Sequence, residues 1–199
     1  AGRRLGIDEY ITLENHDAEL LPTLNVRHQI IRLIRKWEAD LVITHRTNDY
    51  HPDHRYTSMA VQDAAYLVTV PMTCTKTPAL RKNPVFMYLQ DHFQYPYPFK
   101  VNMAVDIDKA LDKKVQAIAA HESQMFEWIP WHGGRLDEVP EGKEERLEWI
   151  RKRWGQSNIS DKTRKALTKW YGKEHANNVE HAEIFQLYEY GSQPTEAEL

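Results

Sequence analysis

The sequence predicts an α/β fold, with a mostly parallel sheet, flanking helices and a helical extension at the carboxyl end. An amphipathic helical pattern runs almost directly into a short apolar segment, which is the helix–strand half of a βαβ unit. The chain has 199 residues, of which 41% are hydrophobic and 28% charged, so it is long enough to bury a sizeable core.

The first helix is expected over residues 26–37, where apolar side chains recur at helical spacing and basic side chains occupy the other face. The segment "ADLVITH" (39–45) follows, with the β-branched run of a buried parallel strand. Residues 55–70 contain neither Gly nor Pro and keep small and apolar residues on one face. We therefore expect helix, strand and helix in this order.

Two more strands are expected at "VFMYL" (85–89) and "KVNMAVDI" (100–107), and a helix over 109–128. We expect residues 1–135 to form the main domain and residues 136–199 to form a charged helical extension that packs on it. The extension should consist of three helical pieces, at 141–155, 160–172 and 177–190.

The composition excludes several classes of protein. The net charge is −3, with Lys and Arg spread among Asp and Glu, so nucleic acid is not an expected partner. No apolar run reaches the roughly 18 residues of a membrane-spanning helix. The single cysteine, Cys74, excludes an internal disulfide and fits a reducing compartment, so we expect a cytoplasmic protein.

The stretch "HRTNDYHPDHRYTSMAVQDA" (45–64) places two histidines where a strand ends and a helix begins. One interpretation is capping, because Pro52 suits the first helical position and Asp53 complements the helix dipole. The other is a metal site, since His51 and His54 lie just past the carboxyl end of a strand, where open parallel sheets bind ligands. The spacing alone leaves both interpretations open.

A catalytic zinc usually has about three protein ligands and an open position. Other candidates for these ligands are scattered along the chain: His16, Asp17, His45, Asp49, His92, His121 and His132. Arg55 is a candidate for holding a substrate oxygen or a structural carboxylate. His121 suits either a pocket or the end of a helix, and Asp17 either the substrate crevice or a turn.

Two aromatic, proline-containing segments, "DHFQYPYPF" (91–99) and "WIPWHGG" (128–134), have two interpretations. Aromatic rings of this kind stack on sugars, and they also close the edge of a core.

Two ordered motifs resemble the LmbE/PIG-L family of zinc-dependent de-N-acetylases. The stretch "ADLVITHRTNDYHPDHRYTSMAVQDAAYL" is similar to a signature of that family. "KKVQAIAAHESQ" is similar to its K-x-x-A-x-x-x-H-x-S-Q stretch, with matches at Lys114, Ala117, His121, Ser123 and Gln124. "LGIDEYITLENHDAEL" is also similar to a family segment, and the resemblance covers approximately Arg3 to Trp131.

This resemblance implies a Rossmann-like fold and hydrolysis of the N-acetyl group of an N-acetylglucosamine-type sugar or related amide. It implies that His54 is a zinc ligand, that His51 polarises the amide carbonyl and that Asp53 orients a histidine. Arg55, His121 and Asp17 are the candidates for substrate binding. Another divalent metal is an alternative to zinc, and a homo-oligomer is an open expectation.

Family members open with a strand ending in A-H-P-D-D-E, which supplies two metal ligands and the general base. Residues 1–199 contain no such segment. We therefore expect those groups to lie upstream of Ala1. Two alternatives remain open: a catalytically inactive, carbohydrate-binding form of the same fold, and an unrelated metal phosphoesterase.

Overall fold

The computed structural model describes residues 1–195, which form two compact units. Unit 1 combines residues 1–13 with residues 104–183, and unit 2 combines residues 14–103 with the chain from residue 184 onward. These units divide the chain at other positions than the predicted boundary between residues 135 and 136. The predicted domain boundary stays a prediction, and the two units are described one at a time.

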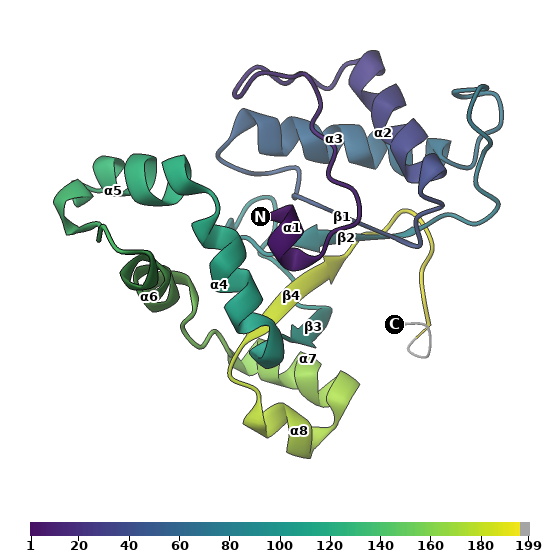
Figure 1. Ribbon diagram of the computed structural model, residues 1–199. Coiled ribbons are helices and arrows are strands. Elements are labelled where there is room, and N and C mark those ends of the chain that lie inside the picture. Colours follow the sequence, from purple (N-terminus) through teal and green to yellow (C-terminus); the bar gives the residue numbers. More distant parts are fainter. Residues whose placement is uncertain (196–199) are drawn as a thin grey trace. The chain divides into compact units, whose positions relative to one another are not determined.

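Figure 1 shows the order of the elements along the chain. The helices are α1 (Gly2–Leu5), α2 (Leu24–Lys36), α3 (Pro52–Leu67), α4 (Leu111–Ala119), α5 (Ile129–His132), α6 (Lys143–Trp154), α7 (Asp161–Tyr171) and α8 (Lys173–Asn178). Shorter helical turns are η1 (Asp108–Ala110), η2 (Ser123–Trp128) and η3 (Leu136–Glu138). The strands are β1 (Leu41–Thr44), β2 (Val85–Leu89), β3 (Met103–Asp106) and β4 (Ala182–Leu187).

In unit 2, α2 and α3 lie side by side and pack on the strands (Figure 1). Helix α2 begins where the Thr23 side chain accepts the backbone N–H of Val26, which satisfies one of the free donors of the first turn. The core joins apolar residues of both helices to Phe86 and Tyr88 of β2, which are both buried. The helix–strand–helix order expected for residues 26–70 is confirmed, and β2 has its expected bounds.

The four strands form one sheet in the order β1-β2-β4-β3. Strands β1 and β2 are parallel, whereas β2 and β4 are antiparallel. The α/β class is confirmed, but the sheet is mixed instead of mostly parallel. The expectation of a third helix over 177–190 is wrong, because residues 182–187 form β4. Along β4 buried and half-buried residues alternate, which is the period of a strand with one face on the core.

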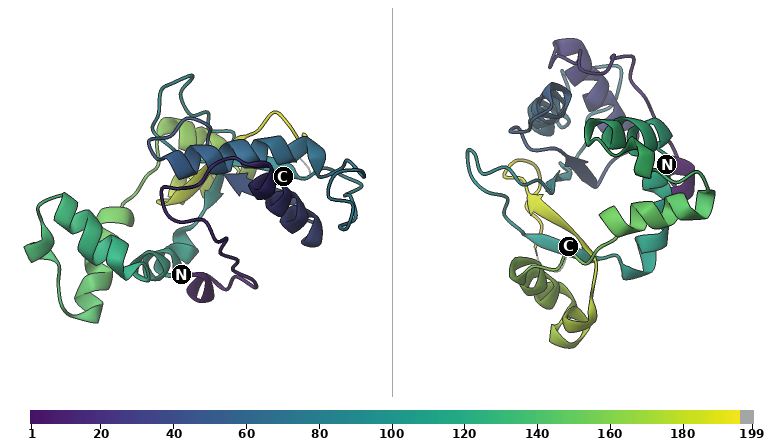
Figure 2. Two further views of the ribbon diagram at one scale, coloured as in Figure 1. Left: turned by 90° about the horizontal axis from the view of Figure 1, so that it is seen from above. Right: turned by 90° about the vertical axis from the view of Figure 1, so that its left-hand side faces the viewer.

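Unit 1 has its own core, in which Val115 of α4 and Phe126 of η2 pack against Trp149 and Ile150 of α6. Figure 2 shows α4 and α6 from two further directions. The helix expected over 109–128 is divided: α4 ends at Ala119, and η2 resumes at Ser123 as a π-helical turn. Helices α6 and α7 confirm the first two helical pieces of the extension.

Among the described residues, no helix is both long enough and apolar enough to cross a membrane.

Candidate active site

The candidate site follows β1 directly, at the carboxyl edge of the sheet. Because β1 and β2 are parallel, with Thr44 beside Tyr88, the segments that follow the two strands leave the sheet at the same edge. The first of them, residues 45–51, leads into α3, whose first residue is Pro52. Parallel strands and a helix start therefore position the histidines, as in other ligand sites at this edge of an α/β sheet.

Three side chains of this segment come together: His45, Asp49 and His54. Each offers a ligand atom, and these atoms lie within 4.8 Å of one another. Two imidazoles and one carboxylate are donors that zinc and related divalent ions accept. The imidazoles of this group therefore suit a divalent metal ion, and the carboxylate suits the orientation of an imidazole; the group does not fix the identity of the ion.

Asp49 fixes the orientation of His54. Its Oδ1 lies 3.0 Å from Nδ1 of His54 and also accepts the backbone N–H of His51 at 3.0 Å. A carboxylate can only accept, so the proton of the neutral His54 ring sits on Nδ1 and leaves Nε2 with a lone pair. This carboxylate–imidazole pair is the arrangement that orients metal-binding histidines.

His51 has the opposite tautomer. Its Nδ1 accepts the backbone N–H of Asp53 at 3.2 Å and so caps α3. The proton of the neutral ring is therefore on Nε2, which becomes a hydrogen-bond donor. The capping and functional interpretations of the histidine pair are compatible, because capping uses one ring nitrogen and leaves the other available.

His45 stacks on His54, with ring centroids 4.3 Å apart and an interplanar angle of 4°. Burial lowers the pKa of His45; proximity to His54 lowers this pKa further, while Asp49 acts in the opposite direction. Neutral imidazole is the form that binds a metal ion. Burial, reinforced by the neighbouring His54, thus favours the neutral state of His45 that coordination requires.

Asp53 contacts a different part of unit 2 with its carboxylate. The two carboxylate oxygens accept the backbone N–H groups of Ala18 at 2.8 Å and Leu20 at 3.2 Å. Asp17, just before this turn, places Oδ1 3.9 Å from Nε2 of His51. The role predicted for Asp53 stays a prediction; its contact with His51 is made through the backbone N–H.

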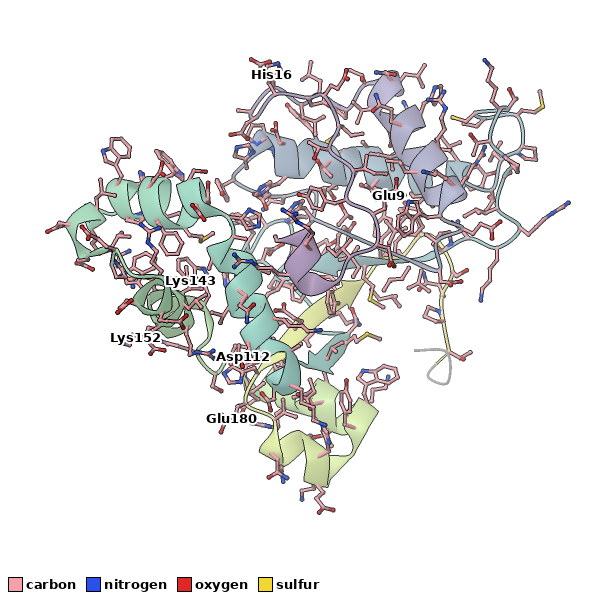
Figure 3. The ribbon with its side chains drawn as sticks, in the orientation of Figure 1. Glu9, His16, Asp112, Lys143, Lys152 and Glu180 are labelled. Atoms are coloured by element: carbon pink, nitrogen blue, oxygen red, sulfur yellow. The ribbon has the colours of Figure 1, made fainter. Side chains whose placement is uncertain are left out.

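Arg55 donates to the backbone carbonyls of Asp49 and Tyr50, at 2.8 and 3.1 Å, and so braces the turn that carries Asp49. Its predicted contact with substrate is untested. His121 is exposed in unit 1, in the break between α4 and η2, and its predicted role also stays open. His16 is exposed on the loop that precedes α2 (Figure 3), outside the His45–Asp49–His54 cluster.

Sequence reasoning overlooked Arg46, which is only 3% exposed. Its guanidinium pairs with Asp91 at 3.2 Å and donates to the carbonyl of Tyr97 at 2.5 Å. This arginine directly follows His45, so the segment that carries the cluster also binds the loop after β2. A charged residue two positions after an apolar strand was the available signal, but its partner lies far away in sequence.

The model of the family described as PIG-L: GlcNAc-PI de-N-acetylase matches residues 1–65, which include the complete His45–Asp49–His54 cluster. The match ends before the second motif at residues 114–124. A curated relative, diacetylchitobiose deacetylase of Thermococcus kodakarensis, is 29% identical over 136 residues. That alignment covers 64% of this chain and 48% of the relative. The chain thus spans about half the length of this relative.

Solved structures with the same fold include an inhibitor complex of N,N'-diacetylchitobiose deacetylase from Pyrococcus horikoshii. Its TM-score is 0.60 at 21% identity, and the alignment covers 94% of this chain and 60% of that one. A conserved protein of Thermus thermophilus gives a TM-score of 0.61 at 18% identity, over 98% of this chain and 71% of that one. The similarity to the LmbE/PIG-L family expected from the motifs is confirmed.

Proposed function

We propose that the protein carrying this chain is a metal-dependent de-N-acetylase acting on an N-acetylglucosamine-type sugar or a related amide. The observation that carries the proposal is that Nδ1 of His51 accepts the N–H of Asp53 whereas Nδ1 of His54 faces the carboxylate of Asp49, which leaves Nε2 of the two rings with opposite hydrogen-bonding roles. Support also comes from the family match over this segment and from a relative named as a diacetylchitobiose deacetylase. The fold alone would not identify the reaction, because one fold hosts many functions.

His54, oriented by Asp49, would hold the metal ion through Nε2, with His45 beside it. A bound divalent ion such as zinc lowers the pKa of its water to about 7 and polarises an amide carbonyl. Asp49 keeps the Nε2 lone pair of His54 directed at the site by holding the ring from the opposite side.

His51 would donate its Nε2 proton in a hydrogen bond to the amide oxygen of the substrate. As a nucleophile adds to the amide carbon, negative charge develops on this oxygen, and the donor then binds it more strongly. Because Nδ1 is occupied by the helix cap, His51 keeps Nε2 as the donating nitrogen throughout. Removing one oxyanion donor typically costs about 10²–10³ in rate.

The proposal includes an N-acetylated sugar or sugar conjugate as partner, a cytoplasmic location and a homo-oligomer, whose size analytical ultracentrifugation would measure. A catalytically inactive, carbohydrate-binding form is the alternative function. It predicts sugar binding without hydrolysis and without stoichiometric metal.

The test compares His51→Gln and His54→Ala with wild type and with His16→Ala, whose exposed side chain lies outside the cluster. We expect His54→Ala to lose bound metal and activity, and His51→Gln to keep metal while its rate falls about 10²-fold or more. His16→Ala should keep both. Retention of metal and deacetylase rate by His54→Ala would show that the site is wrong.

A further inference from the structure

A second feature lies at the same edge of the sheet as the candidate site. The segment 91–99, which we term the aromatic loop, follows β2, and residues 45–51 follow the parallel strand β1. All of these residues belong to unit 2. The aromatic loop therefore emerges next to the segment that carries His45, Asp49 and His54.

Side chains of the site segment fix the backbone of the aromatic loop. Arg46 donates to the carbonyl of Tyr97 at 2.5 Å, and Asn48 donates to the carbonyl of Tyr95 at 2.6 Å. Arg46 also pairs with Asp91, whose Oδ1 accepts the backbone N–H of Phe93 at 3.0 Å. The loop is thus held on both sides of Pro96 by residues adjacent to the metal-ligand candidates.

The ion pair within this anchor is almost completely removed from water. The side chain of Arg46 is 3% exposed and that of Asp91 11%. A pair so buried requires good geometry and further hydrogen bonds to offset its loss of hydration, and the carbonyl of Tyr97 and the N–H of Phe93 provide them. A loop needs no such anchor merely to connect two strands, so the anchor points to a positioning role.

Two tyrosine rings on the aromatic loop and the site segment are exposed. Tyr95 is 81% exposed, and Tyr50, whose ring packs edgewise against His51 and His54, is 76% exposed. Tyr97 is different, because one face of its ring is covered by the guanidinium of Arg46 at 5.0 Å. A single exposed tyrosine needs no explanation. The Tyr50 ring contacts the histidines, and the backbone of Tyr95 is held by Asn48 of the same segment, so both exposed tyrosines belong to the edge of the sheet that carries the cluster. Exposed tyrosines at such an edge resemble the aromatic surfaces that bind the apolar faces of sugar rings.

We propose that Tyr95 on the aromatic loop, together with Tyr50, binds the sugar ring adjacent to the one whose N-acetyl group is removed. The inference rests on the proposed function and adds to it a subsite that favours a disaccharide over a monosaccharide. Arg46, Asp91 and Asn48 are positioning residues, because they act on the ligand through the loop backbone.

The test measures binding of N,N'-diacetylchitobiose and of N-acetylglucosamine by ligand-observed NMR, and deacetylation kinetics with both sugars. We expect Tyr95→Ala to weaken disaccharide binding about tenfold, the effect of losing one stacked ring, and to raise KM for the disaccharide with kcat preserved. Binding of the monosaccharide should not change. Asn48→Ala, which removes one anchor bond from the loop, should give a smaller loss in the same direction.

The matched control is Tyr66→Ala, which removes a tyrosine of comparable exposure, 70%, near the other end of α3. It should bind both sugars as wild type does. Equal disaccharide affinity of wild type and Tyr95→Ala would overturn the subsite while leaving N-acetyl hydrolysis, and hence the proposed function, intact. Disaccharide binding that depends on Tyr95 without any hydrolysis would support the subsite and reject the proposed function.

Discussion

Unit 2 buries two arginines, Arg35 and Arg46, each 3% exposed, and uses them in different ways. All described hydrogen bonds of Arg35 go to backbone carbonyls at the end of α3 and in the chain after it: Leu67, Val68, Val70, Thr73, Cys74 and Thr77. Arg46 instead pairs with a carboxylate, that of Asp91, and holds one carbonyl of the aromatic loop. Burial of an arginine therefore does not reveal its role; the partners do.

The partners also determine whether the interactions of each arginine depend on pH. The carbonyls around Arg35 cannot take up protons, and its planar fork of donors holds a whole turn of chain in place. The Arg46 pair contains a titratable group and lies beside the candidate site. We therefore regard Arg35 as a structural element and Arg46 as a link between fold and site.

The largest expected effect is that of Arg35→Met. It would leave several buried carbonyls without a donor, so we expect it to lower the free energy of unfolding by about 4 kcal/mol or more. Urea denaturation measures this change. Arg32→Met, at an exposed position of the same helix, is the control and should stay within about 0.5 kcal/mol of wild type. If both variants lose a comparable free energy of unfolding, the buried hydrogen bonds of Arg35 do not account for the effect.

Arg46→Met should cost less, about 3 kcal/mol, because it leaves one buried carboxylate without its partner. The double variant Arg46→Met/Asp91→Leu should regain most of this loss, since it buries no unpaired charge. Denaturation of the two variants and wild type gives the comparison. If the double variant is no more stable than Arg46→Met, the cost lies in the lost hydrogen bonds to the Tyr97 carbonyl and the Phe93 N–H and not in the charge of Asp91.

The pH dependence of stability should also distinguish Arg46, whose partner Asp91 titrates, from Arg35, whose partners are backbone carbonyls. Burial raises the pKa of Asp91 above its ordinary value of 3.8, despite the opposing effect of Arg46. In the window from 3.8 up to this raised pKa, the folded state binds more protons than the unfolded state. The contribution of Asp91 to stability therefore falls as pH rises through that window. Asp91→Asn should remove this slope, whereas Arg35→Met should keep it.

Asp108 of unit 1 offers the smallest effect, with the opposite sign. Burial opposes ionisation here, but hydrogen bonds from Glu180 and His181 outweigh it and hold the pKa of Asp108 below 3.8. Its contribution is complete above 3.8 and is lost as pH falls through the lower, folded pKa. Unfolding curves of Asp108→Asn should thus lose part of the wild-type destabilisation in acid. A steeper acid loss in the variant would contradict this sign.

The sequence predicted the fold best where one periodicity dominated. The apolar positions of α2 and the "VFMYL" run of β2 were sufficient. Strand β4 was missed because its alternating "AEIFQL" stands in a strongly charged, helix-rich context, and its pairing with β2 depends on residues far away in sequence.

At the site, the histidine spacing identified His51 and His54, but it did not group Asp49 and His45 with His54. Which side chains of a seven-residue turn converge depends on the path of its backbone. The same limit hid the partner of Arg46. Asp91 lies beyond an intervening helix and strand, and only the parallel pairing of β1 and β2 brings the two segments to one edge.

The interrupted course of unit 2 has a consequence for protein engineering. Its chain leaves after Met103 and returns at Ile184, and at this point Asn102 donates its backbone N–H to the carbonyl of Phe185 at 3.0 Å. Exit and return are thus neighbouring positions, as in a domain inserted into a host. A short hairpin turn joining the two should replace residues 104–183 and give a minimal scaffold that retains the histidine cluster and the aromatic loop.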